Sequence, residues 1–546
     1  MPDIPPIVAQ CAKRLERLSA DRAPFENDWM DIRDLVRPIS VGYSKITNNY
    51  VSLRTQFMYD GTAPDALEEL AASLHSYTMN PAERWFDLQI EDFDSSNDPM
   101  VLMWLEVASD VIYHFYQRET ACLNQAAHET FLDLGSFGSS CLYQEWDFDN
   151  RGLLFSSKPI SDCYICENSK NITDTVFRRV AWTVRQIEQE FGRLPPQLAQ
   201  NQGKNDDTMV ECIHAVFPRS DRATNSMIST NKPFANVWYC NQTKELLEDP
   251  GGYDVFPYHT PRWTKLSGEM YGRGPAKKCL PDIKMLNAME KTLLKAGQKA
   301  VDPPLQLPDE GFLLPIRTAP GALIFYEAGT EKAEQLEFKG NLPWGLEQAN
   351  GKRDFVRKCF YVDWTQLGKD NVEMTAWEAQ DRREEKLRKM SPTIGRVLSE
   401  LHSPMIARSY YLLDYHGFIP PAPVQIQGRR LKVGYSSPAS RAQLSMKGFA
   451  MSQYIQELIP LAQANPDILD AIDWDKYAME LAKWRGVPRT VLRSVEQIAQ
   501  IRQQRKQQQA MMAAPQVAEP ATQAIKNLAD AKSKGMELPQ LQELMG

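Results

Sequence analysis

The sequence lacks the G-x-x-x-x-G-K-S/T pattern with which a phosphate-binding loop holds ATP. The segment 271–275, Tyr-Gly-Arg-Gly-Pro, has only a superficial similarity to such a loop, because its proline removes an amide donor and a third glycine is missing. We interpret this segment as a turn that precedes a helix. The chain is therefore not expected to bind or hydrolyse a nucleotide.

Long hydrophobic runs are also absent. No stretch of about 18 consecutive apolar residues occurs in the chain. The first residues, Met1 to Pro6, contain neither a basic segment nor an apolar one. We expect a protein that is not exported by a signal peptide and has no membrane partner.

Recognisable metal and catalytic patterns are missing. The nine cysteines are odd in number and scattered, which predicts free thiols in a reducing compartment. Cys163 and Cys166 have the spacing of metal ligands, but no second pair follows at the distance of a zinc finger. The seven histidines form no H-E-x-x-H pattern, and nothing fixes the geometry of acidic groups such as Glu91, Asp92 and Asp94. We predict no metal, no cofactor and no catalytic residue.

An excess of positive charge is missing as well. The chain has 62 basic and 70 acidic side chains, which gives a net charge of -8. This balance argues against a surface built for tight, sequence-blind binding of nucleic acid. Any contact with DNA should be local or weak.

What the 546 residues do contain is a helix-rich α+β pattern, too long for a single core. Apolar spacing predicts helices over 7–35, with Pro24 dividing the first, and over 62–78, 98–116 and 123–134. Thr62 is expected to cap the second helix. Strands are predicted from Arg84 and over 141–146, and a mostly antiparallel sheet from about 153 to 258 includes a short helix at 184–191.

The segment from Gly268 to Glu373 interrupts this pattern. A helix is predicted over 275–300, with a kink or a start at Pro281, and a second over 344–365. Three short strand-like runs, 312–314, 322–326 and 333–338, lie between them. A helix, a small sheet and a returning helix indicate an excursion from a larger body.

One face of the first of these helices is cationic. Its lysines fall within a stripe of roughly 80°: Lys277, Lys284, Lys291, Lys295 and Lys299. A charged helix face is most often simply solvated. Repeated around a ring, the same face would form a cationic girdle that contacts DNA phosphates without reading the base sequence. Both interpretations remain open at this point.

Helical patterns return after residue 373. A capping box at Thr375 and Glu378 begins a long helix that runs toward Tyr415, with bends expected at Pro392 and Pro404. Two brief strands are predicted at 424–427 and 431–434, and helical spacing resumes over 437–506. The Ala-, Pro- and Gln-rich tail that follows has too little apolar surface to fold alone.

The order of these features resembles the head-to-tail connector, or portal, proteins of short-tailed, T7-like bacteriophages. The resemblance is carried by Trp29 through Pro38, Asp60-Gly-Thr-Ala63, Leu70-Ala-Ala-Ser-Leu74, Pro81 with Arg84-Trp-Phe-Asp-Leu88, Tyr271-Gly-Arg-Gly-Pro275 with Asp282, Ile283 and Leu286, Met374-Thr-Ala376 with Glu378, Arg382 and Glu385, and Gly417 through Pro420. Each motif is weak singly, but their joint order over most of residues 10 to 435 is specific.

The resemblance implies a portal fold divided into named parts. Residues 1–270 and 375–440 would form the wing, 271–300 and 344–365 the two stem helices, 301–343 the clip, 366–374 the tunnel loop, 441–510 the helical crown and 511–546 a flexible or helical tail. The implied clip residues are Phe312, Leu314, Phe325, Tyr326 and Phe338. The implied tunnel-loop residues are Gln366, Leu367, Gly368, Lys369, Asp370, Asn371 and Val372.

The same resemblance implies a non-enzymatic ring of twelve copies at one capsid vertex. Double-stranded DNA would pass through the ring during packaging and ejection, with the five stem lysines lining the channel. Its implied partners are the terminase large subunit, the major capsid and scaffolding proteins, and tail adaptor proteins. Assembly would take place in the host cytoplasm, and the mature location would be the head-tail junction of the virion. Two alternatives remain: a metal-dependent nucleic-acid-processing enzyme, and a helical scaffold unrelated to phage.

Overall fold

The structure is a computed structural model of the chain, and it divides into two compact units, Met1–Ser440 and Arg441–Gly546. In the first unit it describes residues 4–38, 58–90, 99–199, 207–220, 231–301, 305–306, 334–335, 342–362, 390–426 and 431–435. In the second it describes 448, 451–458, 460, 472–484, 497–498, 500–508 and 526. Within these ranges, no helix is long and apolar enough to cross a membrane.

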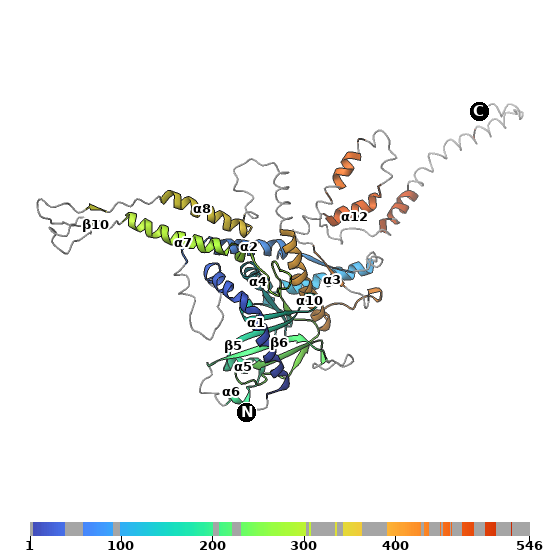
Figure 1. The fold of residues 1–546 in the computed structure, drawn as a ribbon. Coiled ribbons are helices and arrows are strands. Elements are labelled where there is room, and N and C mark those ends of the chain that lie inside the picture. Colours follow the sequence, from blue (N-terminus) through green and yellow to red (C-terminus); the bar gives the residue numbers. More distant parts are fainter. Residues whose placement is uncertain are drawn as a thin grey trace, which may run out of the picture. The chain divides into compact units, whose positions relative to one another are not determined.

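Four helices open the first unit (Figure 1): α1 (Pro6–Leu35), α2 (Thr62–Thr78), α3 (Pro99–Tyr116) and α4 (Leu123–Phe137). All four were predicted, with two corrections. α1 continues through Pro24, because the packing of its apolar face outweighs one lost hydrogen bond. Thr62 is the first helical residue rather than the cap, and its N–H donates to the Asp60 carboxylate at 2.9 Å.

Two antiparallel sheets follow. The larger has the order β4 (Cys163–Glu167), β5 (Thr173–Thr183), β6 (Met209–Pro218), β7 (Phe234–Cys240), β8 (Gly251–Tyr253). The smaller has the order β3 (Gly152–Lys158), β2 (Cys141–Asp147), β9 (Tyr258–His259). The short helices α5 (Val184–Phe191) and α6 (Pro196–Ala199) lie between β5 and β6. The predicted helix-rich α+β class is confirmed.

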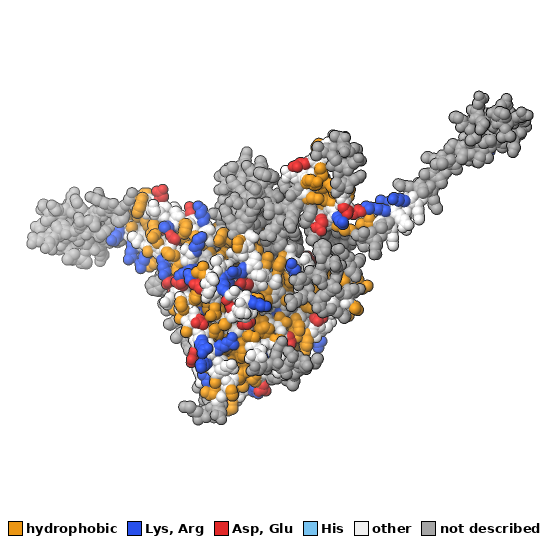
Figure 2. Space-filling view, turned by 45° about the vertical axis from the view of Figure 1, so that its right-hand side comes forward, with side chains coloured by type: hydrophobic (Ala, Val, Ile, Leu, Met, Phe, Trp, Pro, Cys, Tyr) orange, Lys and Arg blue, Asp and Glu red, His pale blue; other side chains and the backbone are white. Residues whose placement is uncertain are grey.

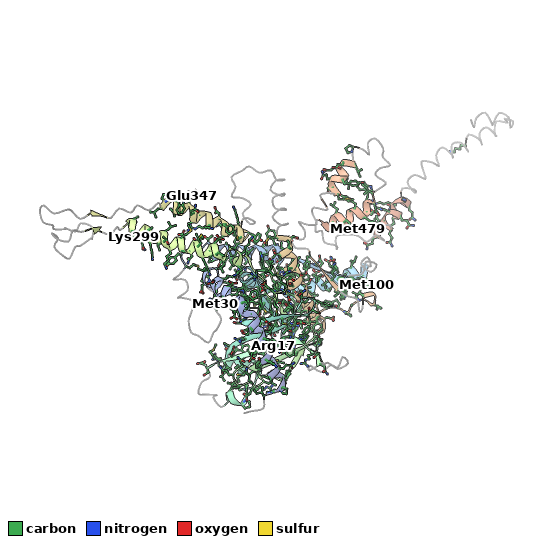
Figure 3. The ribbon with its side chains drawn as sticks, in the orientation of Figure 1. Arg17, Met30, Met100, Lys299, Glu347 and Met479 are labelled. Atoms are coloured by element: carbon green, nitrogen blue, oxygen red, sulfur yellow. The ribbon has the colours of Figure 1, made fainter. Side chains whose placement is uncertain are left out.

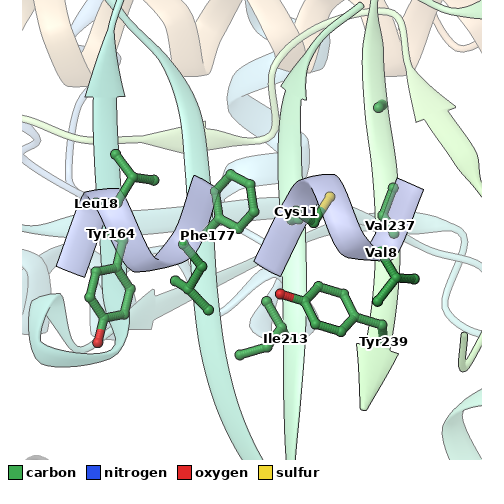
Figure 4. Packing of buried hydrophobic residues seen from close by; sticks show 11 residues of the cluster. Val8, Cys11, Leu18, Tyr164, Phe177, Ile213, Val237 and Tyr239 are labelled. Carbon is green, nitrogen blue, oxygen red and sulfur yellow. The ribbon is translucent and has the colours of Figure 1, made fainter. Parts of the chain in front are cut away.

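The first half of α1 covers one face of the larger sheet (Figure 4). Its residues at 8, 11, 15 and 18 recur every three or four positions and so share one side of the helix. They pack on alternate residues of the strands, including Phe177, Ile213 and Tyr239, which are all fully buried. This contact fixes α1 to the sheet, and the second half of the helix then extends toward α7.

The long helix predicted after Thr375 is described from residue 390. It is helical over 390–397, forms a π turn at Leu398–His402, and continues as α10 (Ser403–Tyr415). A π turn therefore precedes Pro404, where a bend was expected, since proline has no N–H to bond the Glu400 carbonyl. A 3-10 turn at Val424–Ile426 replaces the first predicted strand, but β12 (Leu431–Tyr435) returns as predicted and pairs with β1 (Phe86–Ile90).

Several predicted features lie outside the described residues. These are the five clip residues Phe312, Leu314, Phe325, Tyr326 and Phe338, the tunnel-loop residues 366–372, and the capping box at Thr375. In the clip region the structure describes one antiparallel pair, β10 (Leu305–Gln306) with β11 (Glu334–Gln335). In the second unit it describes α12 (Trp474–Trp484), inside the region predicted to be helical.

Candidate functional site: the two-helix arm

Two long helices of the first unit, α7 (Pro275–Val301) and α8 (Leu342–Cys359), lie side by side and extend away from the sheets (Figure 1). We call this pair the arm. α7 begins at Pro275 and includes Pro281 within the helix, so it does not start at Pro281. α8 ends six residues earlier than predicted, at Cys359, and Tyr361 then adopts a left-handed backbone conformation with φ of 59°.

The two helices of the arm are joined by apolar contacts and ion pairs. Ala349, Val356 and Cys359 of α8 are buried. Lys352 forms an ion pair with Asp282 of α7 at 2.6 Å. A Cβ at Gly345 would lie 2.8 Å from Cδ2 of Leu293, so the helices approach closely there.

The segment 271–275, predicted to be a turn before a helix, forms the root of the arm. It crosses the C-terminal end of α4 so closely that a Cβ at Gly272 would lie 2.3 Å from the carbonyl oxygen of Gly138. The Gly272 N–H donates to Ser139 Oγ at 2.7 Å. The glycines of this turn are required for backbone contact rather than for phosphate binding.

The aromatic ring of Tyr271 anchors the same root in the core. It packs edge-on against Trp29 of α1, with 5.3 Å between ring centroids, and its hydroxyl accepts the Ile165 N–H at 3.1 Å. Burial raises the pKa of Tyr271 well above its usual value. This tyrosine therefore remains neutral and connects α1, β4 and the start of α7.

The five lysines of the predicted stripe differ in their surroundings. Lys277 pairs with Asp28, and Lys284 pairs with Asp31 at 2.5 Å, both on α1. The Lys291 ammonium lies 5.5 Å from the centre of the Tyr59 ring. Lys295 and Lys299 are exposed and have no ion-pair partner in the part of the chain that the structure describes. Figure 3 labels Lys299 near the far end of α7, and Figure 2 shows Lys and Arg side chains along the arm.

Large apolar side chains are also exposed on the arm. They are Met285 (51% exposed), Leu294 (55%), Val301 (88%), Trp344 (61%), Leu346 (50%) and Phe355 (44%). The apolar faces of the two helices predict that Ile283, Leu286, Leu293 and Phe355 make an isolated monomer unstable or sticky. The structure corrects this for Ile283 and Leu286, which the chain itself buries to 5% and 2% exposure, whereas Phe355 is exposed.

The comparisons with known proteins decide the family. A family model described as "Bacteriophage head to tail connecting protein" matches residues 8–492. The chain belongs to this family. It is 27% identical over 508 residues to the "Probable portal protein" of Bordetella phage BPP-1, covering 91% of this chain and 90% of that protein. It is also 27% identical over 533 residues to the "Portal protein" of Salmonella phage epsilon15, covering 95% of both.

The bacteriophage head to tail connecting proteins are a structural, non-enzymatic family, which confirms the prediction that this chain is not an enzyme. The described residues contain no cluster of three or more His, Cys, Asp or Glu that could hold a metal ion. All nine cysteines are free, as predicted. The buried histidines have structural roles: His214 hydrogen-bonds Tyr258 at 2.6 Å and Asn236 at 2.8 Å.

Sequence reasoning missed one buried charge cluster in this connector chain. Arg262 is 2% exposed and binds the carboxylate of Glu400, in the π turn, through its backbone N–H and two guanidinium nitrogens. The same guanidinium contacts Glu167, which also pairs with Lys265 at 2.5 Å. No periodicity marks Arg262, because it lies in irregular backbone between β9 and the arm. The cluster ties the root of the arm to the long helix.

Proposed function

We propose that this chain is a portal protein, twelve copies of which form a ring at one capsid vertex and conduct double-stranded DNA during packaging and ejection. One observation carries the proposal. The two helices of the arm present both a cationic stripe and exposed large apolar side chains, in a chain that belongs to the connecting-protein family. The names of the two phage relatives support the same function.

The apolar side chains of the arm argue for the ring. Three large apolar side chains of the arm are about half exposed: Met285 on α7, and Leu346 and Phe355 on α8. They can be removed from solvent only if another molecule covers them. Copies related by rotation cover each other's arms through a head-to-tail contact, which closes into a ring when the rotation is a whole fraction of a turn. We therefore propose that neighbouring copies bury these side chains.

The charge distribution argues for DNA in the channel. The chain as a whole carries a net charge of -8, so its positive potential must be local. We propose that the lysine stripe, Lys277, Lys284, Lys291, Lys295 and Lys299, lines the channel. Contacts with phosphates alone carry no sequence information, which suits a conduit through which every sequence must pass.

The remaining parts of the chain have proposed roles that follow from the resemblance. Residues 301–343, which connect the two helices of the arm in the sequence, would dock the terminase large subunit and later the tail adaptor proteins. The tunnel loop at 366–374 would face the channel, and residues 441–510 would form the crown inside the head. The rest of the first unit would form the wing and meet the major capsid and scaffolding proteins. The protein would assemble in the host cytoplasm and remain at the head-tail junction of the virion.

A packaging reaction tests this function. Heads assembled with or without the chain are mixed with terminase, ATP and DNA, and the DNA that resists nuclease is measured. We expect protected DNA only with heads that contain the chain. Equal protection in heads that lack it would contradict the proposal.

A further inference from the structure

We propose that the lysine stripe of α7 divides into two parts: Lys277 and Lys284 hold the arm to α1, and only Lys291, Lys295 and Lys299 are available to DNA. This inference rests on the proposed function and narrows it, because the resemblance alone treats the five lysines as one set.

The first part of the stripe is neutralised within the chain. Lys277 pairs with Asp28, and Lys284 pairs with Asp31, so two cations of α7 meet two anions of α1. Asp28 and Asp31 are three residues apart and therefore share one face of α1. The ammonium groups of Lys277 and Lys284 already have carboxylates where a phosphate would have to bind.

Other contacts hold the same stretch of the arm. The Asn287 side chain accepts the Tyr59 N–H at 2.7 Å. Arg353 of α8 binds both Asp60, at 2.9 Å, and Glu290 of α7, at 2.6 Å. Up to Glu290, α7 therefore has polar partners from its own chain along one side, and Lys277 and Lys284 have a positioning role.

The second part of the stripe has a different environment. Lys291, Lys295 and Lys299 follow one another at four-residue intervals, which places them about 6 Å apart along the helix axis. No acidic residue of α7 follows Glu290, so its last eleven residues, 291–301, carry three positive charges and no negative one. The facing stretch of α8, 342–350, has one acidic residue, Glu347 (Figure 3). Among the described residues, Glu347 forms no ion pair with these lysines.

These two environments predict different responses to charge removal. A lysine that contacts phosphate releases a counterion from DNA, so its loss weakens binding and lowers the salt dependence of the affinity. A lysine held by an aspartate on the protein surface contributes little to DNA binding, and its loss loosens the helix contact instead. The salt dependence of DNA binding and the hydrogen exchange of α1 and α7 therefore separate the two roles.

The experiment compares two double variants of the assembled full-length protein. The distal variant is Lys295→Gln with Lys299→Gln, and the proximal variant is Lys277→Gln with Lys284→Gln. Binding of a short double-stranded DNA to the rings is measured between 50 and 200 mM salt, and amide exchange is measured over 25–35 and 275–290. We expect the distal variant to lose about tenfold in affinity at low salt, with a smaller salt dependence and unchanged exchange.

The proximal variant should show faster exchange over 25–35 and 275–290, with an affinity and salt dependence close to those of the wild-type protein. A third variant, Asp28→Asn with Asp31→Asn, keeps all five lysines and should reproduce the faster exchange without any loss of DNA binding. Equal losses of affinity in the proximal and distal variants would overturn the division while leaving the proposed function intact. Wild-type rings that bind no DNA would instead contradict the proposed channel itself.

Discussion

Arg262 and Glu400 lie 138 residues apart in the chain and form a bidentate ion pair, with the Arg262 Nη2 atom 2.7 Å and its Nε atom 3.1 Å from the two carboxylate oxygens. The backbone N–H of Arg262 donates to the same carboxylate at 2.9 Å. Because Arg262 leads to the root of the arm and Glu400 lies in the π turn, this pair fixes the arm relative to the long helix.

Glu400→Gln should destabilise the protein by about 3 kcal/mol, because it leaves the buried Arg262 guanidinium with an incomplete set of partners. The change is measured as a fall in the thermal unfolding midpoint. Glu269→Gln is the matched control, because Glu269 pairs with Arg273, whose side chain is 43% exposed. This substitution should lower the free energy of unfolding by less than about 1 kcal/mol. Equal effects of the two substitutions would show that the Arg262 pair does not stabilise the fold.

Gly272→Ala should prevent normal folding of the arm root, because the added Cβ would lie 2.3 Å from the Gly138 carbonyl oxygen and 2.9 Å from the Arg262 Cβ. Gly351→Ala, in the middle of α8 with nothing within 4 Å of the added Cβ, should instead stabilise the protein by roughly 0.5 to 1 kcal/mol. Soluble yield and thermal unfolding of both variants measure the difference. A well-folded Gly272→Ala protein would contradict the close crossing of the two segments.

Stability should fall as the pH drops below about 6.5. Burial lowers the pKa of His214, His259 and His402 to about 3, so the unfolded chain binds protons at these sites at pH values where the folded chain does not. As the pH falls from 6.5 to 3, each such histidine lowers the free energy of unfolding by about 1.4 kcal/mol per pH unit. Thermal unfolding measured from pH 7.5 to 4.5 should show this decline, and a flat profile would exclude it.

His402→Phe tests one of these sites directly. Neither ring nitrogen of His402 has a hydrogen-bond partner in the described structure, and the ring packs 5.0 Å from Trp85. Phenylalanine keeps the planar ring and cannot take up a proton. The free energy of unfolding of the variant minus that of the wild-type protein should be about 2 kcal/mol larger at pH 5 than at pH 7.5. No change in this difference would mean that His402 does not contribute to acid sensitivity.

Assembly should depend on the exposed apolar side chains of the arm. The double variant Leu346→Glu with Phe355→Glu places two charges where the neighbouring copy would cover them, and we expect it to remain largely monomeric at concentrations where the wild-type protein assembles. Ile4→Glu, at a half-exposed position outside the arm (51% exposed), is the control and should assemble normally. Sedimentation velocity measures all three proteins, and normal assembly of the double variant would rule out these contacts.

Local patterns predicted the elements well where the local sequence also defines their ends. The predicted bounds of α5, Val184–Phe191, coincide with the structure because Thr183 and Gln186 form a capping box and Gly192 ends the helix in a left-handed conformation. The predicted break at Pro24 and the predicted helix start at Pro281 were wrong, because tertiary packing keeps α1 and α7 helical through these prolines. A proline changes one hydrogen bond, whereas a long apolar face contributes many contacts.

The candidate site was only partly predictable. The lysine stripe follows from helical periodicity, which depends on neighbours within one helix. Helical periodicity does not predict the partners of the first two lysines of the stripe, because these partners are far away in the sequence. Asp31, for example, lies 253 residues before Lys284. The Arg262–Glu400 pair has the same character, because irregular backbone and a π turn bring it together. Long-range ion pairs between irregular segments leave no periodic signal in a sequence.

The most direct test of this account is electron microscopy of the purified full-length protein. If the chain forms a portal, the particles should be rings with a central opening wide enough for a DNA duplex, and class averages should show twelve subunits. Micrographs of concentrated protein that contain only monomers or irregular aggregates would contradict the proposed ring.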